Sequence, residues 1–387
     1  CLAHLRTAIC ATHLDVAMLT DHAPHMNEGT IEDALLAAAD DELIRDGAGN
    51  AYASIVTCED GHEVVLTVGS ENALMPVGLR RHVLEGVTVD ELESAYDAET
   101  PAAVDEFRAA GALVLVNHTE QRPLDSLRML APDGIEIYNI HANLDPRIRS
   151  EYLGLDSDFL ADLIRLIMPG NGVAPDLLAL AFLEENRNDL DKWDALLAEG
   201  VRMPGLAGSD AHENAFANPL ADGERADSYR RVMRWFSNHM LVDTTLPRPE
   251  RYEEALAAAR FYVAFEAFGS PVGFDFIAET ATVTAEMGET VAPGATLRVV
   301  APTLPPDQPR DPAPDIRLRI LRSTATGAVE VAAGTGPTLE HVATEPGAYR
   351  AEVFILPNHA RPYVGARSDL IREHVWIYSN AIHVVPD

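Results

Sequence analysis

The sequence predicts an α/β barrel followed by a small antiparallel β-sandwich. Three observations support this prediction. The chain has 387 residues, which suits one barrel of about 250 residues and one smaller domain. In the first part of the chain, short apolar runs alternate with helix-like segments, a pattern typical of a parallel sheet. After about residue 273, strand-length runs separated by proline- and glycine-rich turns replace this alternation, as expected for a sandwich.

Each apolar run of the first part ends in polar or charged residues. The runs and the residues after them are 14–20 with Asp21 and His22, 63–68 with Glu71, 112–116 with Asn117 and His118, 135–138 with Asn139 and His141, and 205–208 with Asp210 and His212. The carboxyl ends of barrel strands lie on one rim. We therefore expect these polar side chains to converge there.

Helical spacing and turn signals define the remaining elements. Helices are predicted at 2–12, 102–110, 157–167, 176–186, 229–239 and 249–262, and strands of the tail at 296–300, 316–322, 349–356 and 375–378. The predicted domains are a barrel over 1–272 and a sandwich over 277–387. We expect the sandwich to supply none of the metal ligands.

Charge and hydropathy narrow the range of partners. Asp and Glu outnumber Lys and Arg by 61 to 29, which gives a net charge of −32. Such a charge repels a phosphate backbone and excludes duplex nucleic acid as a resting partner; it is also explained by solubility or a salty habitat. No run reaches the roughly 18 apolar residues of a membrane helix, so we expect no membrane span. The oligomeric state stays open.

The cysteines carry little information. Cys1, Cys10 and Cys58 form an odd set without a CxxC pair, so we expect neither a disulfide framework nor a thiolate zinc site. Cys10 lies on the apolar side of the first predicted helix, where we expect a buried thiol. The chain begins with Cys instead of Met, which indicates a missing upstream segment. Localisation, cytoplasmic or exported, stays open.

The polar residues at the strand ends have the character of metal ligands. Imidazole nitrogens and carboxylate oxygens that converge on a rim are what a divalent-metal hydrolase needs. A single histidine after a strand is more often structural, but several such strand ends together favour a metal site. His25 could reach the same rim but is better explained as a loop residue. The Arg80–Arg81 pair could bind a phosphate, although such pairs are commonly a solvated face. For His141, substrate contact and a structural role are equally good explanations.

Several segments resemble the motifs of the polymerase and histidinol phosphatase (PHP) domain family. The matching segments are LDVAMLTDH at 14–22, Gly69-Ser70-Glu71, VLVNHTE at 114–120 and GLAGSDAH at 205–212. His82, eleven positions after Glu71, lies where many members place a ligand. GAYRAEV at 347–353 and YSNAI at 378–382 resemble segments of PHP phosphoesterases with an added C-terminal β domain. The resemblance covers roughly residues 1–270.

The resemblance implies a distorted (β/α)7-type barrel that works as a metal-dependent phosphoesterase on a small phosphorylated substrate. It implies about two or three divalent ions per complete site, Zn²⁺, Mn²⁺ or Fe²⁺, with the ligands His22, Glu71, His82, His118, Asp210 and His212. Asp210, His141 and Arg81 are the expected catalytic residues: Asp210 fixes the metals, and the other two stabilise developing charge. The family's opening His-x-His motif is absent from this chain, since His4 and His13 lack its spacing. Either the N-terminal strand that carries the motif is missing from this sequence, or this member has lost those ligands.

Two other functions fit the same residues. A metal-dependent hydrolase of carbon esters or amides would use the same ligands. A degenerate, non-catalytic barrel with a ligand-binding β domain would need none of them.

Overall fold

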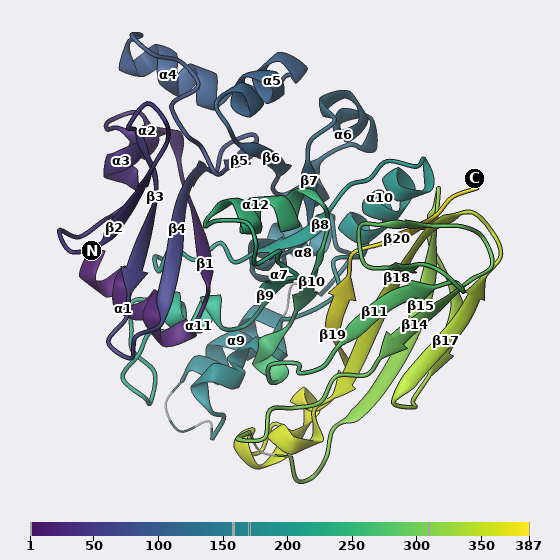
Figure 1. Ribbon diagram of the computed structural model, residues 1–387. Coiled ribbons are helices and arrows are strands. Elements are labelled where there is room, and N and C mark those ends of the chain that lie inside the picture. The colour runs from purple at the N-terminus through teal and green to yellow at the C-terminus, as the bar shows by residue number, and fades with distance from the viewer. Residues whose placement is uncertain (1, 157–158, 169, 171, 309, 387) are drawn as a thin grey trace. The chain divides into compact units, whose positions relative to one another are not determined.

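The computed structural model describes residues 2–156, 159–168, 170, 172–308 and 310–386 (Figure 1). It is a mixed α/β structure with several sheets and a β-rich C-terminal region. The chain divides into two compact units, one of Cys1–Glu136 with Val242–Ala257 and one of Ile137–Leu241 with Ala258–Asp387. Among the described helices, none is long and apolar enough to cross a membrane.

The first unit is built on six strands and the start of a seventh, β7 (Gly134–Asn139), through which the chain passes into the second unit. The strands are β1 (Val16–Asp21), β2 (Glu42–Arg45), β3 (Ala51–Thr57), β4 (Glu63–Ser70), β5 (Met75–Val77) and β6 (Leu113–Val116). The helices are α1 (Leu2–Thr12), α2 (Ala23–Met26), α3 (Ile31–Ala34), α4 (Val89–Tyr96), α5 (Pro101–Ala109), η1 (Thr119–Gln121), α6 (Leu124–Leu130) and α12 (Glu250–Ala257).

The sheet of the first unit is mixed, which corrects the expectation of a parallel sheet. β1 pairs with β4 and β6 with β7 in parallel, whereas the β2–β3, β3–β4, β4–β5 and β5–β6 pairs are antiparallel. The short β3–β4 and β4–β5 connections explain this difference, because strands joined by a tight turn run antiparallel. The described strands follow the order β2-β3-β4-β5-β6-β7-β8, with β1 on β4, and this order does not by itself show a closed barrel.

A disulfide between Cys10 and Cys58 corrects the prediction of a buried free thiol. Cys10 lies in α1, whose bounds agree with the predicted helix, and Cys58 follows β3. Their Cα atoms are 5.6 Å apart. Cysteine spacing along the chain does not reveal which cysteines meet in space, so this pair could not be predicted. The disulfide ties the N-terminal helix to the sheet.

The second unit begins with helices that follow β7. They are α7 (Ile140–Leu144), α8 (Pro146–Glu151), α9 (Phe159–Ile167), η2 (Pro175–Ala181), α10 (Arg187–Ala198) and α11 (Tyr229–Met233). Residues 157–158 of the helix predicted at 157–167 lie outside the described residues. The helix predicted at 229–239 is wrong in its second half, since β9 (Ser237–Met240) follows α11; likewise α12 ends at Ala257, and β10 (Phe261–Ala264) occupies the end of the helix predicted at 249–262.

Two sheets make up most of the second unit. One has the order β13-β20-β18-β19-β10-β9, with β15 on β18 and β16 on β15, and the other has the order β12-β11-β14-β17. The remaining elements of the second unit are β8 (Gly205–Gly208), η3 (Glu266–Phe268), β11 (Asp275–Glu279), β12 (Thr284–Ala285), β13 (Thr290–Val291), β14 (Ala295–Val300), β15 (Asp315–Thr324), β16 (Gly327–Gly334), β17 (Thr338–Ala343), β18 (Gly347–Leu356), η4 (Asn358–Tyr363), η5 (Ser368–Leu370), β19 (His374–Ser379) and β20 (Ile382–Val384). β8 neighbours β7 in the sheet order.

The sheet of the C-terminal region includes strands from before residue 272. β10 pairs antiparallel with β19 and also with β9. Phe265, just after β10, donates its backbone N–H to the carbonyl of Trp376 at 2.9 Å. The predicted boundary between 272 and 277 therefore lies inside the second compact unit, and the two-domain division at that point stays a prediction.

One buried arginine of the second unit is paired with buried carboxylates. Arg350 of β18 is fully buried and donates from Nη2 to Oδ2 of Asp194 in α10 at 2.8 Å. It also bonds to Glu352, a second buried carboxylate. Burial favours the neutral form of Glu352, but Arg350 and Arg319 outweigh burial and hold the pKa of this carboxyl below its ordinary value. A buried charge persists only with such partners.

Candidate functional site

Two of the predicted ligand segments adjoin in the first unit because their strands are parallel neighbours. Asp21 ends β1 and pairs with Ser70 at the end of β4, so His22 and Glu71 follow at the same edge. The His22 Nδ1 lies 2.6 Å from the Glu71 carbonyl oxygen, and the Glu71 backbone N–H donates to the Asp21 carbonyl at 3.0 Å. The expected proximity of His22 and Glu71 is therefore present.

Glycine at position 69 makes this geometry possible. Gly69 pairs with Val77 of β5, and a Cβ at position 69 would lie 2.4 Å from the carbonyl oxygen of Pro76. A side chain there would push β5 away from β4. The glycine of the Gly-Ser-Glu segment therefore permits the strand pairing that precedes Glu71.

His118 lies among carboxylates in the first unit. Its Nε2 is 3.5 Å from Oε1 of Glu71, and its Nδ1 is 3.5 Å from Oε1 of Glu120. Its backbone N–H donates to Oε2 of Glu136 at 2.9 Å. Interaction with Glu120 and Glu71 raises the pKa of His118 to about 10, although burial opposes this rise. Three carboxylates around one imidazole form a site that favours positive charge.

Glu120 and Glu136 are the residues of this group that the sequence did not single out. Both are almost fully buried. Glu136 occupies the middle of the apolar strand β7, and a carboxylate in an otherwise apolar strand is a signal that could have identified it. Glu120 follows His118 by two positions, which gives no comparable signal.

His82 and Arg81 make other contacts. His82 has Nδ1 2.9 Å from the Tyr96 hydroxyl and Nε2 2.9 Å from the Gly29 carbonyl oxygen. Arg81 donates from Nη2 to the carbonyl of Ala109, at the end of α5, at 3.0 Å. These contacts explain both side chains as structural, so neither the metal-ligand role of His82 nor the catalytic role of Arg81 gains support. His25 lies exposed on α2.

The remaining predicted residues lie together in the second unit. Oδ1 of Asp210 is 3.1 Å from Nε2 of His212, and Oδ2 is 3.3 Å from Nδ1 of His141. The Asp210 side chain is 10% exposed, against 43% for His141 and 50% for His212. The side chain of Asn139, at the end of β7, accepts from the His141 backbone N–H at 2.7 Å and so begins α7. One nearly buried carboxylate is thus flanked by two accessible imidazoles.

Asp210 and His118 share an uncommon backbone conformation. Each follows a strand, β8 or β6, and each has a positive φ, 46° for Asp210 and 49° for His118. Residues other than glycine rarely adopt this conformation, and where they do the strain often marks a functional position. His13, Leu36, Ala131, Glu213 and Ala259 also have a positive φ, so this conformation does not by itself mark a functional position.

A pocket of about 340 Å³ lies beside Asp210 in the second unit. Its lining includes His141, Asp210 and His212. Four carboxylates, those of Asp145, Asp210, Glu213 and Asp227, line it, and no lysine or arginine is found among the lining residues that the structure describes. An anion in this pocket therefore requires an added cation.

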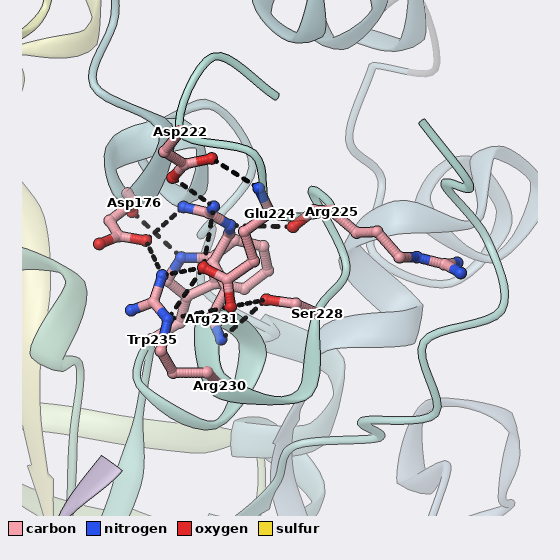
Figure 2. A network of polar contacts seen from close by, with 8 residues as sticks. All are labelled: Asp176, Asp222, Glu224, Arg225, Ser228, Arg230, Arg231 and Trp235. Carbon is pink, nitrogen blue, oxygen red and sulfur yellow. Dashed lines mark hydrogen bonds and ion pairs between the residues drawn. The ribbon is translucent and has the colours of Figure 1, made fainter. Parts of the chain in front are cut away.

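Three other carboxylates, those of Asp176, Asp222 and Glu224, lie within 4.8 Å of one another in the second unit. Figure 2 shows that arginine side chains occupy the space between them. Arg231 is fully buried, bonds to Asp176 and donates from Nη2 to Oδ2 of Asp222 at 2.7 Å. Arg230 donates from Nε to Oε2 of Glu224 at 2.9 Å. The cluster serves as the counter-charge of buried Arg231, which makes it a poor fit for a metal ion.

Comparisons with known proteins identify no relative of this chain. No protein-family model, no curated protein and no solved structure matches it.

Proposed function

We propose that this protein is a metal-dependent phosphoesterase that hydrolyses a phosphomonoester or phosphodiester. The observation that carries the proposal is the nearly buried carboxylate of Asp210, held between His141 and His212 at a pocket. Among the described lining residues four are acidic and none is lysine or arginine, so metal ions would offset the repulsion between the carboxylates and a phosphate group. The resemblance to PHP motifs agrees with this chemistry.

The donor set fits divalent ions such as Zn²⁺, Mn²⁺ or Fe²⁺. Imidazole nitrogen and carboxylate oxygen are ligands that these ions accept. Within the first unit, taken by itself, the proposed ligands are His22, Glu71 and His118. Within the second unit, taken by itself, they are Asp210 and His212. Three carboxylates surround His118, an excess of negative charge that suits a cation. His82 is left out because both of its ring nitrogens are hydrogen-bonded.

Bound metal ions would hold the phosphoryl oxygens and lower the pKa of a water molecule. The protein's own groups would complete the chemistry. Asp210 would fix the positions of the His141 and His212 imidazoles through its two oxygens. His141 is half-exposed at the pocket and is placed to donate a proton to the leaving oxygen.

The proposal includes the finer architecture, a distorted (β/α)7-type barrel followed by a β-sandwich. In its support, α5, β6, α6 and β7 alternate in the first unit, and two mainly antiparallel sheets occupy the C-terminal region.

Asp210→Asn and Asp222→Asn, matched changes at the two acidic sites of the second unit, test the metal assignment. Bound metal is measured by elemental analysis and hydrolysis with a panel of phosphate esters. We expect Asp210→Asn to lose activity by 10³-fold or more, on the order of the loss for a key transition-state group, and Asp222→Asn to keep metal and activity. The reverse result would assign the metal to the Asp176 cluster. No metal and no hydrolysis in the wild-type protein would favour a non-catalytic fold.

Hydrolysis of carbon esters or amides is a second candidate, favoured by the same acidic lining. A neutral carbonyl substrate suffers no repulsion from the four carboxylates, whereas a phosphate does. Carboxylate esters and amides therefore belong in the same panel. Turnover of these substrates without turnover of phosphate esters would replace the phosphoesterase proposal.

A further inference from the structure

The pocket beside Asp210 has an apolar wall built from several elements of the second unit. Helix α9 contributes Leu163 and Ile167, η2 contributes Leu178, and α11 contributes Val232; Phe182 and Trp235 complete the wall. Leu178, Phe182 and Trp235 are buried, and the rings of Phe182 and Trp235 meet edge to face with centroids 5.2 Å apart. These three side chains of the wall are therefore packed within the unit.

Two of the carboxylates in the lining are already used by the backbone. Asp145 begins α8 and accepts from the N–H groups of Arg147 and Ile148, both at 2.9 Å. Asp227 accepts from the N–H groups of Ala215 and Phe216 at 2.6 and 2.8 Å. These carboxylates hold helix and loop backbone in place. Polar recognition of a ligand therefore rests mainly on the Asp210 end of the pocket.

The volume of the pocket limits the size of the ligand group that it can bind. Small-molecule pockets have volumes of about 300–1,000 Å³, and 340 Å³ lies near the lower limit. A sugar or polyol would place several hydroxyl groups against this apolar wall, where each would lose its hydrogen bonds to water. An aromatic ring or a short branched alkyl chain would gain from burial instead.

We propose that this pocket binds a small apolar group, a single aromatic ring or a short branched alkyl chain, on the alcohol side of the phosphoester that the Asp210 site hydrolyses. This inference rests on the proposed function and names its substrate class. The alcohol group lies against the wall formed by Leu163, Ile167 and Val232. The phosphate lies toward Asp210 and His212.

Two substitutions on one helix form a matched pair of variants. Ile167 lines the pocket and is partly exposed, so Ile167→Asn should fold. Ile164, three residues earlier on α9, is 56% exposed, is not among the lining residues and takes the same change as Ile164→Asn. Both variants place the same polar group in the same helix, so any general effect on α9 is common to them.

Hydrolysis and binding are measured separately. The first measurement compares kcat/KM for benzyl phosphate and glycerol 3-phosphate in the metal-loaded protein, since both release an alkyl alcohol. The second titrates benzyl alcohol into the metal-free protein by NMR. We expect benzyl phosphate to be preferred by about tenfold or more, the effect of apolar contacts in a binding pocket. Ile167→Asn should reduce this preference and weaken benzyl alcohol binding, whereas Ile164→Asn should change neither.

The outcomes separate this inference from the proposed function. Hydrolysis without a preference for benzyl phosphate, or a preference that Ile167→Asn leaves unchanged, overturns the inference while the phosphoesterase stands. Failure of benzyl alcohol to bind also overturns it. Binding of benzyl alcohol that depends on Ile167, with no hydrolysis of any phosphate ester, supports an apolar pocket and overturns the proposed function.

Discussion

Arg350 of β18 and Asp194 of α10 face each other with both side chains fully buried, and Nη2 of the arginine lies 2.8 Å from Oδ2 of the aspartate. They are 156 positions apart in the chain. The pair therefore joins a strand of the C-terminal sheet to a helix that precedes β8. Removing the Arg350 side chain would leave the buried carboxylate of Asp194 without its counter-charge.

We expect Arg350→Met to lower the free energy of unfolding by about 3–5 kcal/mol, the usual effect of breaking a buried ion pair. Chemical denaturation measures this change. Arg350→Met combined with Asp194→Asn is the control, because the second substitution removes one stranded charge. The double variant should lose less stability than the sum of the two single changes. Simple additivity would show that the pair is not coupled.

Residues 258–276 should be needed for the C-terminal sheet to fold alone. Trp376 of β19 donates its indole N–H to the carbonyl of Gly269 at 2.8 Å, and β10 covers one edge of β19. A fragment of residues 277–387 exposes this edge, whereas 258–387 keeps it paired. We expect the longer fragment to be more resistant to denaturant and less prone to aggregate, since unpaired edges associate. Equal stability and solubility would support the boundary predicted near residue 277.

The sequence predicted strands best where an apolar run could be read locally. The runs at 14–20, 63–68, 112–116, 135–138 and 205–208 correspond to β1, β4, β6, β7 and β8. β9 was missed because Ser237–Met240 is short and partly polar, and its pairing with β10 depends on residues more than twenty positions away. Local pattern cannot supply such long-range pairing.

The candidate site was predictable in part, because some of its residues directly follow apolar runs that can be recognised as strands. Strand ends identified His22, Glu71 and His118, which lie together in the first unit. His82 was inferred from its spacing after Glu71, and spacing could not show that Tyr96 and Gly29 contact both ring nitrogens.

The apolar pocket next to Asp210 was also beyond sequence reasoning. Its wall combines α9, η2 and α11, elements that only the tertiary fold brings together.

Two buried histidines should make the protein less stable in acid. Burial lowers the pKa of His374 and of His383 to about 4, from the ordinary histidine value of 6.5. The unfolded chain therefore binds protons below about pH 6.5 that the folded protein does not bind until about pH 4. The free energy of unfolding should fall as the pH is lowered through this window, by up to about 3 kcal/mol per histidine. His374→Phe, which keeps a ring against Phe268, should reduce the slope; an unchanged slope in urea unfolding at pH 4–7 would contradict this assignment.

The Cys10–Cys58 disulfide should stabilise the first unit. It closes a loop with a sequence separation of 48, and the chain-entropy model gives about 4 kcal/mol for a loop of this length. Cys10→Ser with Cys58→Ser should lower the free energy of unfolding by about 2–4 kcal/mol. Urea unfolding with and without a reducing agent measures it. If reduction weakens the wild-type protein but not the double variant, the effect belongs to this disulfide; if it weakens neither, the bond contributes no stability.

Metal binding at the first unit should depend on His118 and not on His82. His118 is surrounded by Glu71, Glu120 and Glu136, whereas His82 is hydrogen-bonded to Tyr96 and Gly29 through its two ring nitrogens. A ligand that binds only the folded state stabilises it by about 2.7 kcal/mol at one hundred times its Kd. Mn²⁺ at that excess should therefore raise the unfolding temperature of the wild-type protein and of His82→Gln. His118→Gln should lose most of this increase.

The readout for each protein is the difference between unfolding with Mn²⁺ and unfolding with a chelator. Any change that a substitution makes to the metal-free stability cancels in this difference, including the loss of the imidazole between Glu71 and Glu120. Because a histidine is replaced by glutamine in both variants, a difference between them arises from the position of the histidine and not from the kind of substitution. If the Mn²⁺-dependent increase in unfolding temperature is fully kept in both variants, His118 binds no metal. A loss confined to His82→Gln would mean that its hydrogen bonds to Tyr96 and Gly29 give way on metal binding, and it would restore His82 as a ligand.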